Sequence, residues 1–342
     1  MRSRPAFTRG IARRSTDAGA AAGALGGRIP DFFIVGHAKS GTTALYEMLR
    51  QHPQIFMPDT KEPWFFAADM QPRFRPPRGS VLPQTLEEYM ALFAGAHAGQ
   101  RAGEASTSYL WSRTAAGAIA EVQPDARIVA ILREPASFLR SLHVQFLESY
   151  VETESDFRTA ISLEDARREG RRIPRRSRWP QLLRYSDHVR YTDQLRRYHE
   201  HFPSDQVLVL IYDDFRADNE AAVRKVLSVL EVDDSYPIPV MDVNPTRRSM
   251  RSQRLDDVVH ALSVGRGPFS HAAKATVKAL TPRQLRRDAL RATQRRLVYG
   301  APPPEDLHFM AELRRRFRPE VVALGDYLGR DLVSLWGYDT IP

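Results

Sequence analysis

Apolar residues gather in three short runs along the chain. The runs cover 31–35, 127–132 and 207–212, and each is bounded by polar or turn-forming residues. Runs of this length are typical of strands buried on both faces. Apolar residues at helical spacing follow each run, over 44–52, from about Pro135, and over about 219–230. Strands that alternate with helices predict an α/β fold, in which a central parallel sheet lies between two layers of helices.

Proline, glycine and arginine interrupt this pattern in three places. A loop is predicted over 66–85, an arginine-rich insertion over about 151–185, and a basic insertion of short helical pieces over about 245–305. No internal repeat is visible. We therefore expect a single domain over 29–342, preceded by a flexible basic tail over 1–28.

The two ends of the chain carry different signals. The first 14 residues hold five arginines, and a stretch of alanine and glycine follows up to residue 27; it lacks the apolar core of a signal peptide and favours a tail over 1–28. At the other end, a helix is predicted over 319–328, with Leu335 and Trp336 packing it onto the sheet.

Composition limits the possible chemistry. The chain has 342 residues, 42% of them apolar, and no cysteine. Disulfides, thiolate catalysis and cysteine-ligated metals are therefore excluded, and we expect a cytoplasmic protein. No apolar run approaches the roughly 18 residues of a membrane-spanning helix.

Positive charge is concentrated in two segments. The net charge is +9, and residues 246–300 contain 13 Lys and Arg against 3 Asp and Glu. A second cluster lies within 167–178. Basic blocks attract nucleic acid, anionic membranes or anionic substrates, or form a solvated face. We expect 246–300 to flank an acceptor cleft, to steer an anionic donor or to contact an anionic membrane peripherally; no nucleic-acid partner is expected.

A candidate phosphate loop lies between the first strand and the first helix. It reads Gly36-His37-Ala38-Lys39-Ser40-Gly41-Thr42-Thr43. Backbone N–H groups and the helix dipole can hold a phosphate at such a junction. However, Lys39 lies upstream of the position that a magnesium-triphosphate loop gives its lysine. The second strand also ends at Arg133 without an acidic residue placed to hold magnesium, so a magnesium-triphosphate donor is disfavoured.

A second anion site is predicted on the next α/β unit. Arg133 ends the strand 127–132, and Ser141 lies within the following helix. An arginine at a strand end can bind a phosphate through two hydrogen bonds, and a nearby serine can add another donor. Two separate phosphate sites suggest a donor that is phosphorylated at both ends of its nucleoside.

These motifs resemble those of the sulfotransferases that use 3′-phosphoadenosine 5′-phosphosulfate (PAPS). Val35–Leu45 looks like their 5′-phosphosulfate loop, and Leu132–Pro135 with Ser141 looks like their 3′-phosphate motif. Lys61–Phe66 and Gly103–Leu110 are similar to two elements of the heparan-sulfate-type branch. The resemblance implies a P-loop-like fold, PAPS as co-substrate, 3′-phosphoadenosine 5′-phosphate (PAP) as product, and no required metal.

The resemblance also implies roles for individual residues. Glu62 would be the general base and Lys39 would offset charge on the leaving oxygen. The expected nucleotide-binding residues are Lys39, Ser40, Gly41, Thr42, Thr43, Arg133 and Ser141. Lys61 is either a further positive group or a surface lysine. Glu104 and His37 are alternative bases that have structural roles as well.

The sequence departs from the branch in its acceptor region. Ala105 stands where the branch has a lysine, and Trp64 where a histidine is common. The acceptor is therefore left open among small molecules, natural products, carbohydrates and lipids, through a hydroxyl or an amine. Two other functions remain possible, a nucleotide-binding regulatory protein that needs no Glu62, and a kinase-like phosphoryl transferase that needs magnesium.

Overall fold

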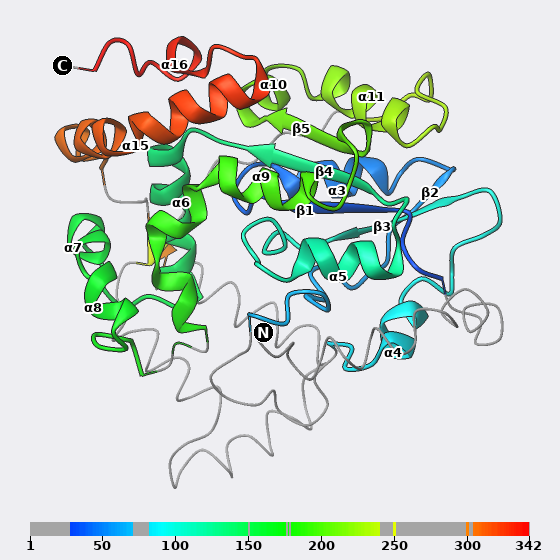
Figure 1. The fold of residues 1–342 in the computed structure, drawn as a ribbon, viewed down its shortest axis with the longest axis horizontal. Coiled ribbons are helices and arrows are strands. Elements are labelled where there is room, and N and C mark those ends of the chain that lie inside the picture. Colours follow the sequence, from blue (N-terminus) through cyan, green and yellow to red (C-terminus); the bar gives the residue numbers. More distant parts are fainter. Residues whose placement is uncertain are drawn as a thin grey trace, which may run out of the picture.

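Parallel strands form the centre of the fold in the computed structural model (Figure 1). The structure describes residues 28–70, 82–149, 151–175, 177, 179–239, 249–250, 299–300 and 304–341. Within these residues the central sheet has five strands, in the spatial order β2-β3-β1-β4-β5. They are β1 (Phe32–Gly36), β2 (Ile55–Phe56), β3 (Arg101–Ala105), β4 (Arg127–Leu132) and β5 (Val207–Ile211).

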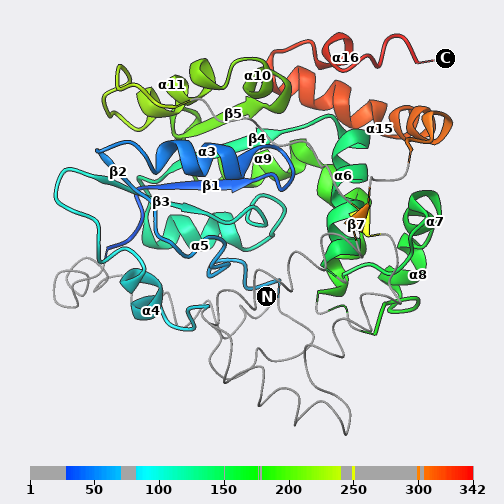
Figure 2. The ribbon, with the colours of Figure 1, turned by 180° about the vertical axis from the view of Figure 1, so that it is seen from behind.

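Helices follow the strands along the chain and cover both faces of the sheet. The α-helices of the described residues are α3 (Thr42–Leu49), α4 (Leu86–Ala91), α5 (Ala115–Val122), α6 (Pro135–Glu148), α7 (Phe157–Ser162), α8 (Glu164–Arg168), α9 (Tyr191–His199), α10 (Tyr212–Ala217), α11 (Asn219–Val229), α15 (Leu307–Leu328) and α16 (Leu332–Leu335). Three short 3₁₀ turns are η1 (Pro180–Leu183), η2 (Tyr185–Val189) and η3 (Ser204–Gln206). Figure 1 shows α9 in front of the sheet, and Figure 2, from behind, shows α3 in front of it.

Alternating side chains of each central strand enter two different cores. In β1, Phe32 and Ile34 pack with α3 and α11, while Phe33 and Val35 pack with α5, α6 and α9. All four side chains are buried. Because both faces are covered, the strand is apolar at every position, which is the pattern that predicted it. The predicted α/β architecture, with a parallel sheet between helices, is confirmed.

The strands β2 and β3 were not predicted, because β2 has only two residues and β3 has no apolar run. β3 reads Arg-Ala-Gly-Glu-Ala, and it pairs with β1 in parallel, Phe32 lying opposite Gly103. A Cβ atom at Gly103 would lie 2.1 Å from the Phe32 ring and 2.6 Å from Met57 Sδ. Phe32 and Met57 therefore pack directly against the backbone of β3 at Gly103. The pattern of apolar residues does not reveal a strand that is buried in this way.

The last helix begins earlier than predicted. The prediction placed its start at Pro319, whereas α15 begins at Leu307 and contains Pro319 in its interior. Asp306 caps the helix, since its carboxylate accepts a hydrogen bond from the Phe309 N–H at 2.9 Å. A buried stripe on α15 packs against the core and offsets the roughly 3 kcal/mol cost of an interior proline. The stripe includes Phe309, Met310, Leu313, Phe317, Val321 and Leu324.

The loop predicted over 66–85 has no helix or strand at 66–70 and 82–85, and its remaining residues lie outside the described part. The tail predicted over 1–28 also lies outside it, except for Arg28. Of the insertion predicted over 245–305, the structure describes little beyond two short strands, β6 (Ser249–Met250) and β7 (Tyr299–Gly300), which pair antiparallel. In the described residues no helix is both long and apolar enough to span a membrane.

A buried ion pair stabilises the arginine-rich segment 151–185 from within, and a tyrosine of the same segment contacts α6. Arg167 donates to Glu152 through Nη2–H at 2.8 Å, and its Nη1 lies 2.7 Å from the other carboxylate oxygen. The two side chains are 1% and 0% exposed. Tyr185 also donates to Glu152, at 3.2 Å, and its hydroxyl lies 2.9 Å from His143 Nδ1 on α6. Arg167, one of the arginines within 167–178, is thus a core residue and not part of a solvated face.

Arg167→Met should lower the free energy of unfolding by about 3–5 kcal/mol, because it leaves the Glu152 carboxylate buried without its counter-charge. Urea denaturation measures the change. Arg171→Met is the control, since Arg171 pairs with Glu169 at the exposed surface. That control should change stability by less than about 0.5 kcal/mol. Equal effects of the two substitutions would contradict the structural role of Arg167.

Candidate active site

The phosphate loop joins the end of β1 to the start of α3, as predicted. Gly41 precedes the helix with φ of 87°, in the left-handed region that favours glycine. No side chain at this position caps the first turn of α3. The backbone N–H groups that begin a helix need partners from outside it. The start of α3 is therefore suited to an anion.

His37 belongs to this loop, and its side chain is buried. Its Nε2 lies 2.9 Å from the His188 carbonyl oxygen, and its ring lies edge-on to Phe138. Burial, followed by repulsion from His188, lowers the pKa of His37 to about 3. His37 is thus a neutral residue of the loop's interior, and the alternative assignment as a base is not supported.

Arg133 at the end of β4 lies against the phosphate loop. Its Nη1–H donates to the Lys39 carbonyl oxygen at 2.9 Å, and its guanidinium lies 4.7 Å from the centre of the Tyr212 ring. Tyr191 donates to the Arg133 carbonyl oxygen at 3.0 Å. Lys39 and Arg133, which were predicted from two separate motifs, therefore meet at one loop.

Two carboxylates near these cations were not predicted. Burial lowers the pKa of Lys39, and the charge of Glu148 on α6 acts in the opposite direction. Glu134 caps α6, since its carboxylate accepts from the N–H groups of Ala136 and Ser137 at 3.0 and 2.7 Å. Tyr338 near the C-terminus donates to Glu134 at 2.6 Å. Pro135 marked the start of this helix in the sequence, whereas glutamate is not a typical capping residue and gave no signal for the cap.

Ser141, the other predicted ligand of the 3′-phosphate, is buried on α6. The helix stands at the carboxyl edge of the sheet (Figures 1 and 2). Arg133 and Ser141 therefore belong to one strand–helix unit. Ser40 and Thr42 are buried in the loop, while Thr43 is exposed at the first turn of α3.

The candidate base Glu62 lies beside the end of β3. Its N–H donates to the Ala105 carbonyl oxygen at 3.0 Å. Its carboxylate accepts from Trp64 Nε1–H at 3.3 Å and from the Thr107 hydroxyl at 3.4 Å. The side chain remains 36% exposed, so a proton donor from solution can reach it.

Lys61 connects the segment Lys61–Phe66, here called the base loop because it holds Glu62, to the phosphate loop. Its Nζ donates to the Thr43 hydroxyl at 2.7 Å and lies 3.9 Å from Glu62 Oε1. The structure therefore brings Glu62 and Thr43 together through one ammonium group. From the sequence, Lys61 could have been either a further positive group at the site or a surface lysine.

Backbone strain coincides with these contacts. Lys39, Glu62 and Trp64 have φ of 60°, 58° and 55°, and they are three of the five non-glycine residues with positive φ in the described residues. Such conformations cost of order 1–3 kcal/mol each and gather at functional sites. The strain at three positions supports the assignment of this region as the site.

The aromatic residues after Glu62 divide between core and site. Phe65 and Phe66 are buried, and Phe65 stacks on Tyr89 with ring centres 4.7 Å apart. Trp64 is only partly buried and meets Trp179 edge-on at 5.1 Å. Trp179 comes from the arginine-rich segment, and no sequence motif indicated it.

Glu104 lies behind the base loop and is fully buried. Tyr89 and Tyr109 donate to its Oε2 at 2.5 and 3.2 Å, while its Oε1 has no hydrogen-bond partner in the described residues. Burial raises the pKa of Glu104 to about 7. Tyr109 also accepts from the Phe66 N–H at 3.2 Å. Glu104 thus supports the loop from within the core and is screened from solvent, unlike Glu62.

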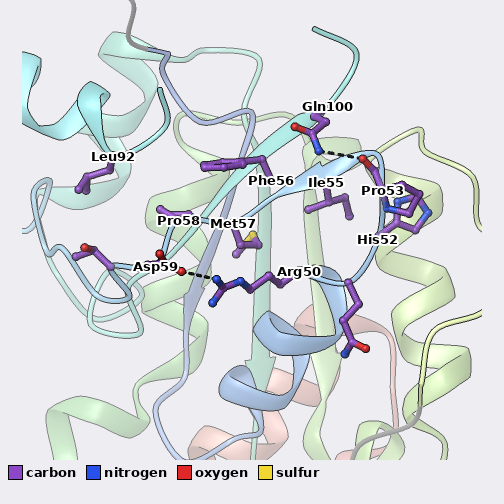
Figure 3. A pocket seen from close by; sticks show the side chains of 12 residues that line it. Arg50, His52, Pro53, Ile55, Phe56, Met57, Pro58, Asp59, Leu92 and Gln100 are labelled. Atoms are coloured by element: carbon purple, nitrogen blue, oxygen red, sulfur yellow. Dashed lines mark hydrogen bonds and ion pairs between the residues drawn. The ribbon is translucent and has the colours of Figure 1, made fainter. Parts of the chain in front are cut away.

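A separate pocket of about 550 Å³ lies around β2 and the C-terminal end of α3 (Figure 3). Arg50 and Asp59 form an ion pair there, and Gln100 donates to the Pro53 carbonyl oxygen at 2.9 Å. None of the predicted site residues lines this pocket. In the described part of the chain, no group of three or more histidine, aspartate or glutamate residues is arranged to hold a metal ion.

Comparisons with known proteins point to one family. Carbohydrate sulfotransferase 15 of Homo sapiens is 30% identical over a region covering 35% of this chain and 28% of that protein. Heparan sulfate glucosamine 3-O-sulfotransferase 3A1 of Mus musculus is 27% identical, over 59% of this chain and 46% of that protein. The chain thus spans less than half the length of these relatives.

A solved structure gives broader coverage. The sulfotransferase from Alicyclobacillus acidocaldarius is 26% identical, with a TM-score of 0.62 over 90% of this chain and 98% of that one. The sequence profile of the sulfotransferase domain matches residues 29–264, which is more than half of the chain. The phosphate loop, the strand-end arginine and the base loop all lie within this match, and the chain belongs to the sulfotransferase domain family.

Proposed function

We propose that this protein transfers a sulfuryl group from PAPS to a hydroxyl or amine of an acceptor, with Glu62 as the general base. The observation that carries the proposal is the bridge from the phosphate loop to an accessible carboxylate: Lys61 Nζ lies 2.7 Å from the Thr43 hydroxyl and 3.9 Å from Glu62 Oε1. A carbohydrate is the favoured acceptor class, because the relatives are carbohydrate and heparan sulfate sulfotransferases.

The residues present fit a donor with two phosphate groups. The uncapped start of α3 and Lys39 suit the 5′-phosphosulfate, while Arg133 and Ser141 suit the 3′-phosphate. The donor, when bound, supplies a sulfuryl group on a bridging oxygen that departs with the 5′-phosphate. Burial lowers the pKa of Lys39 and so eases proton sharing with that oxygen.

Glu62 would accept the proton of the acceptor hydroxyl. Its two oxygens are already oriented by the Trp64 indole and the Thr107 hydroxyl. A general base must lie within hydrogen-bond reach of the proton it removes. The Glu62 side chain is partly exposed, which leaves room for an acceptor beside it. Glu104 cannot do this, because it is fully buried beneath the loop.

Two alternatives make different predictions for ligand binding. A kinase-like phosphoryl transferase would prefer ATP with magnesium, and a regulatory nucleotide-binding protein would bind PAP without catalysing transfer. Isothermal titration with PAP, and separately with ATP and magnesium, distinguishes the first alternative. The Glu62 variant described below distinguishes the second.

Arg133→Ala should weaken PAP binding by about 1.5–3 kcal/mol, the range for hydrogen bonds to charged groups. Ser141→Ala should weaken PAP binding less than this, because the hydroxyl donates one hydrogen bond to the phosphate whereas the guanidinium can donate two and carries a charge. Isothermal titration with PAP measures both. Arg224→Ala on α11 is the control, since Arg224 pairs with Glu220 away from the loop, and it should leave PAP affinity unchanged. An unaltered dissociation constant in Arg133→Ala would remove Arg133 from the nucleotide site.

Glu62→Gln should reduce turnover by about 10²-fold or more, because the amide keeps the shape of the side chain but does not accept the proton. Binding of PAP should stay nearly unchanged. The measurement is the rate of PAP release from PAPS in the presence of acceptor. Retention of more than about a tenth of wild-type turnover would show that another group is the base.

Glu104→Gln should keep most of the turnover but change how stability depends on pH. The raised pKa of Glu104 means that its carboxyl is protonated in the folded protein below about pH 7 and ionises at a cost above it. Wild-type stability should therefore fall between about pH 5 and 8, by up to about 3 kcal/mol, relative to the variant. Urea denaturation at several pH values tests this. Parallel pH profiles of wild type and variant would contradict it.

A further inference from the structure

Lys61 holds a position that its sequence context does not explain. Its Nζ contacts the Thr43 hydroxyl at 2.7 Å, lies 3.9 Å from Glu62 Oε1, and sits 5.8 Å from the centre of the Tyr46 ring. The side chain is 22% exposed, and burial lowers its pKa while Glu62 and Glu47 act in the opposite direction. A surface lysine would extend into solvent instead of entering the space between a phosphate loop and a carboxylate.

The choice of lysine at this position is itself unusual for this chain. Of its 50 basic residues only five are lysines, namely Lys39, Lys61, Lys225, Lys274 and Lys278. Two of the three lysines in the described residues lie at the candidate site. Arginine is a planar, forked group, whereas lysine is a compact charge with three donors on a flexible stem. A compact ammonium is suited to a place where several oxygens approach one point.

The end of β3 supplies no cation to this place. The end of β3 contributes Ala105, Ser106 and Thr107, which are uncharged, and Glu104 behind them is an acid. Arg133 is engaged on the far side of the loop by the Lys39 carbonyl oxygen. Among these residues, Lys61 is the cation that lies between Glu62 and the phosphate loop.

We propose that Lys61 contacts the sulfuryl group during transfer and offsets the negative charge on its oxygens. The inference rests on the proposed sulfotransferase function. In the step, the acceptor oxygen forms a bond to sulfur while the bond from sulfur to the bridging oxygen breaks. The bonding electron pair leaves with the 5′-phosphate of PAP, and the acceptor proton passes to Glu62. Lys61 keeps its protons throughout and acts as an electrostatic donor.

The absence of cysteine permits a specific test of this charge. Lys61→Cys introduces the only thiol in the chain, and alkylation with 2-bromoethylamine then restores an ammonium of nearly lysine length. Alkylation with iodoacetamide adds a neutral group of similar size. Lys225→Cys, on the exposed face of α11, is the matched control for the substitution and for both reagents. Circular dichroism and urea denaturation show whether each variant is folded.

Binding of PAPS and of PAP, measured separately without acceptor, distinguishes contact with the sulfuryl group from support of the loop. We expect Lys61→Cys to weaken PAPS binding by about tenfold and PAP binding by less than about twofold, because PAP lacks the sulfuryl group. Slow hydrolysis of PAPS to PAP and sulfate, in which water is the acceptor, should fall by about 10²-fold. Aminoethylation should restore both values and the neutral adduct neither.

Equal losses of PAP and PAPS affinity would assign Lys61 only to holding Thr43 and would overturn the proposal. Unchanged PAPS affinity and hydrolysis in Lys61→Cys, or rescue by the neutral adduct, would overturn it as well. In each of these cases wild-type protein still binds PAPS, so the proposed function survives. Failure of the wild-type protein to bind either nucleotide would instead reject the proposed function, and this inference with it.

Discussion

The parallel pairing of β3, β1 and β4 is the constraint on which the candidate site depends. Because the three strands run in one direction, the segments that follow them begin at one edge of the sheet. The segment after β1 is the phosphate loop, that after β4 begins with Arg133, and that after β3 holds Glu62 through the Ala105 carbonyl and the Thr107 hydroxyl. Residues more than 70 positions apart in the chain, such as Lys39 and Arg133, are thereby brought together.

The base loop is held from two sides. On the core side, Phe65 and Phe66 pack among the tyrosines that bind Glu104, which fixes the backbone just after Glu62. On the solvent side, Lys61 ties the loop to Thr43. The left-handed φ angles of Glu62 and Trp64 are stabilised by these contacts. Backbone strain of this kind persists only where the surrounding structure holds the residue in place. Here the edge of the sheet and the buried aromatic cluster do so.

The sequence predicted the parts of the fold that apolar runs encode. β1, β4 and β5 are each apolar along their length because helices cover both faces, and the phosphate loop follows from its glycines and its place between strand and helix. β3 was missed because it has no apolar run. Its Gly103 is needed because the Phe32 ring leaves no space for a side chain there, and such a packing constraint cannot be seen in the sequence. The start of α15 was missed because a buried stripe outweighs the effect of Pro319.

The residues of the candidate site that belong to short motifs could be predicted. Those whose roles depend on contacts between distant segments could not. Lys39, Arg133 and Glu62 were named from motifs, and the structure gathers them around one loop. The roles of Lys61 and Trp179 depend on contacts across 18 and 115 positions, for which local sequence holds no signal.

We expect this edge of the sheet to transfer a sulfuryl group and not a phosphoryl group. Incubation with PAPS that carries radioactive sulfur, in the presence of a panel of saccharides, phenols, lipids and amines, tests it most directly. We expect the label to move to at least one acceptor in wild-type protein, and transfer to be lost in Glu62→Gln. Label that remains in the donor with every acceptor, while phosphorus is transferred from ATP with magnesium, would contradict it.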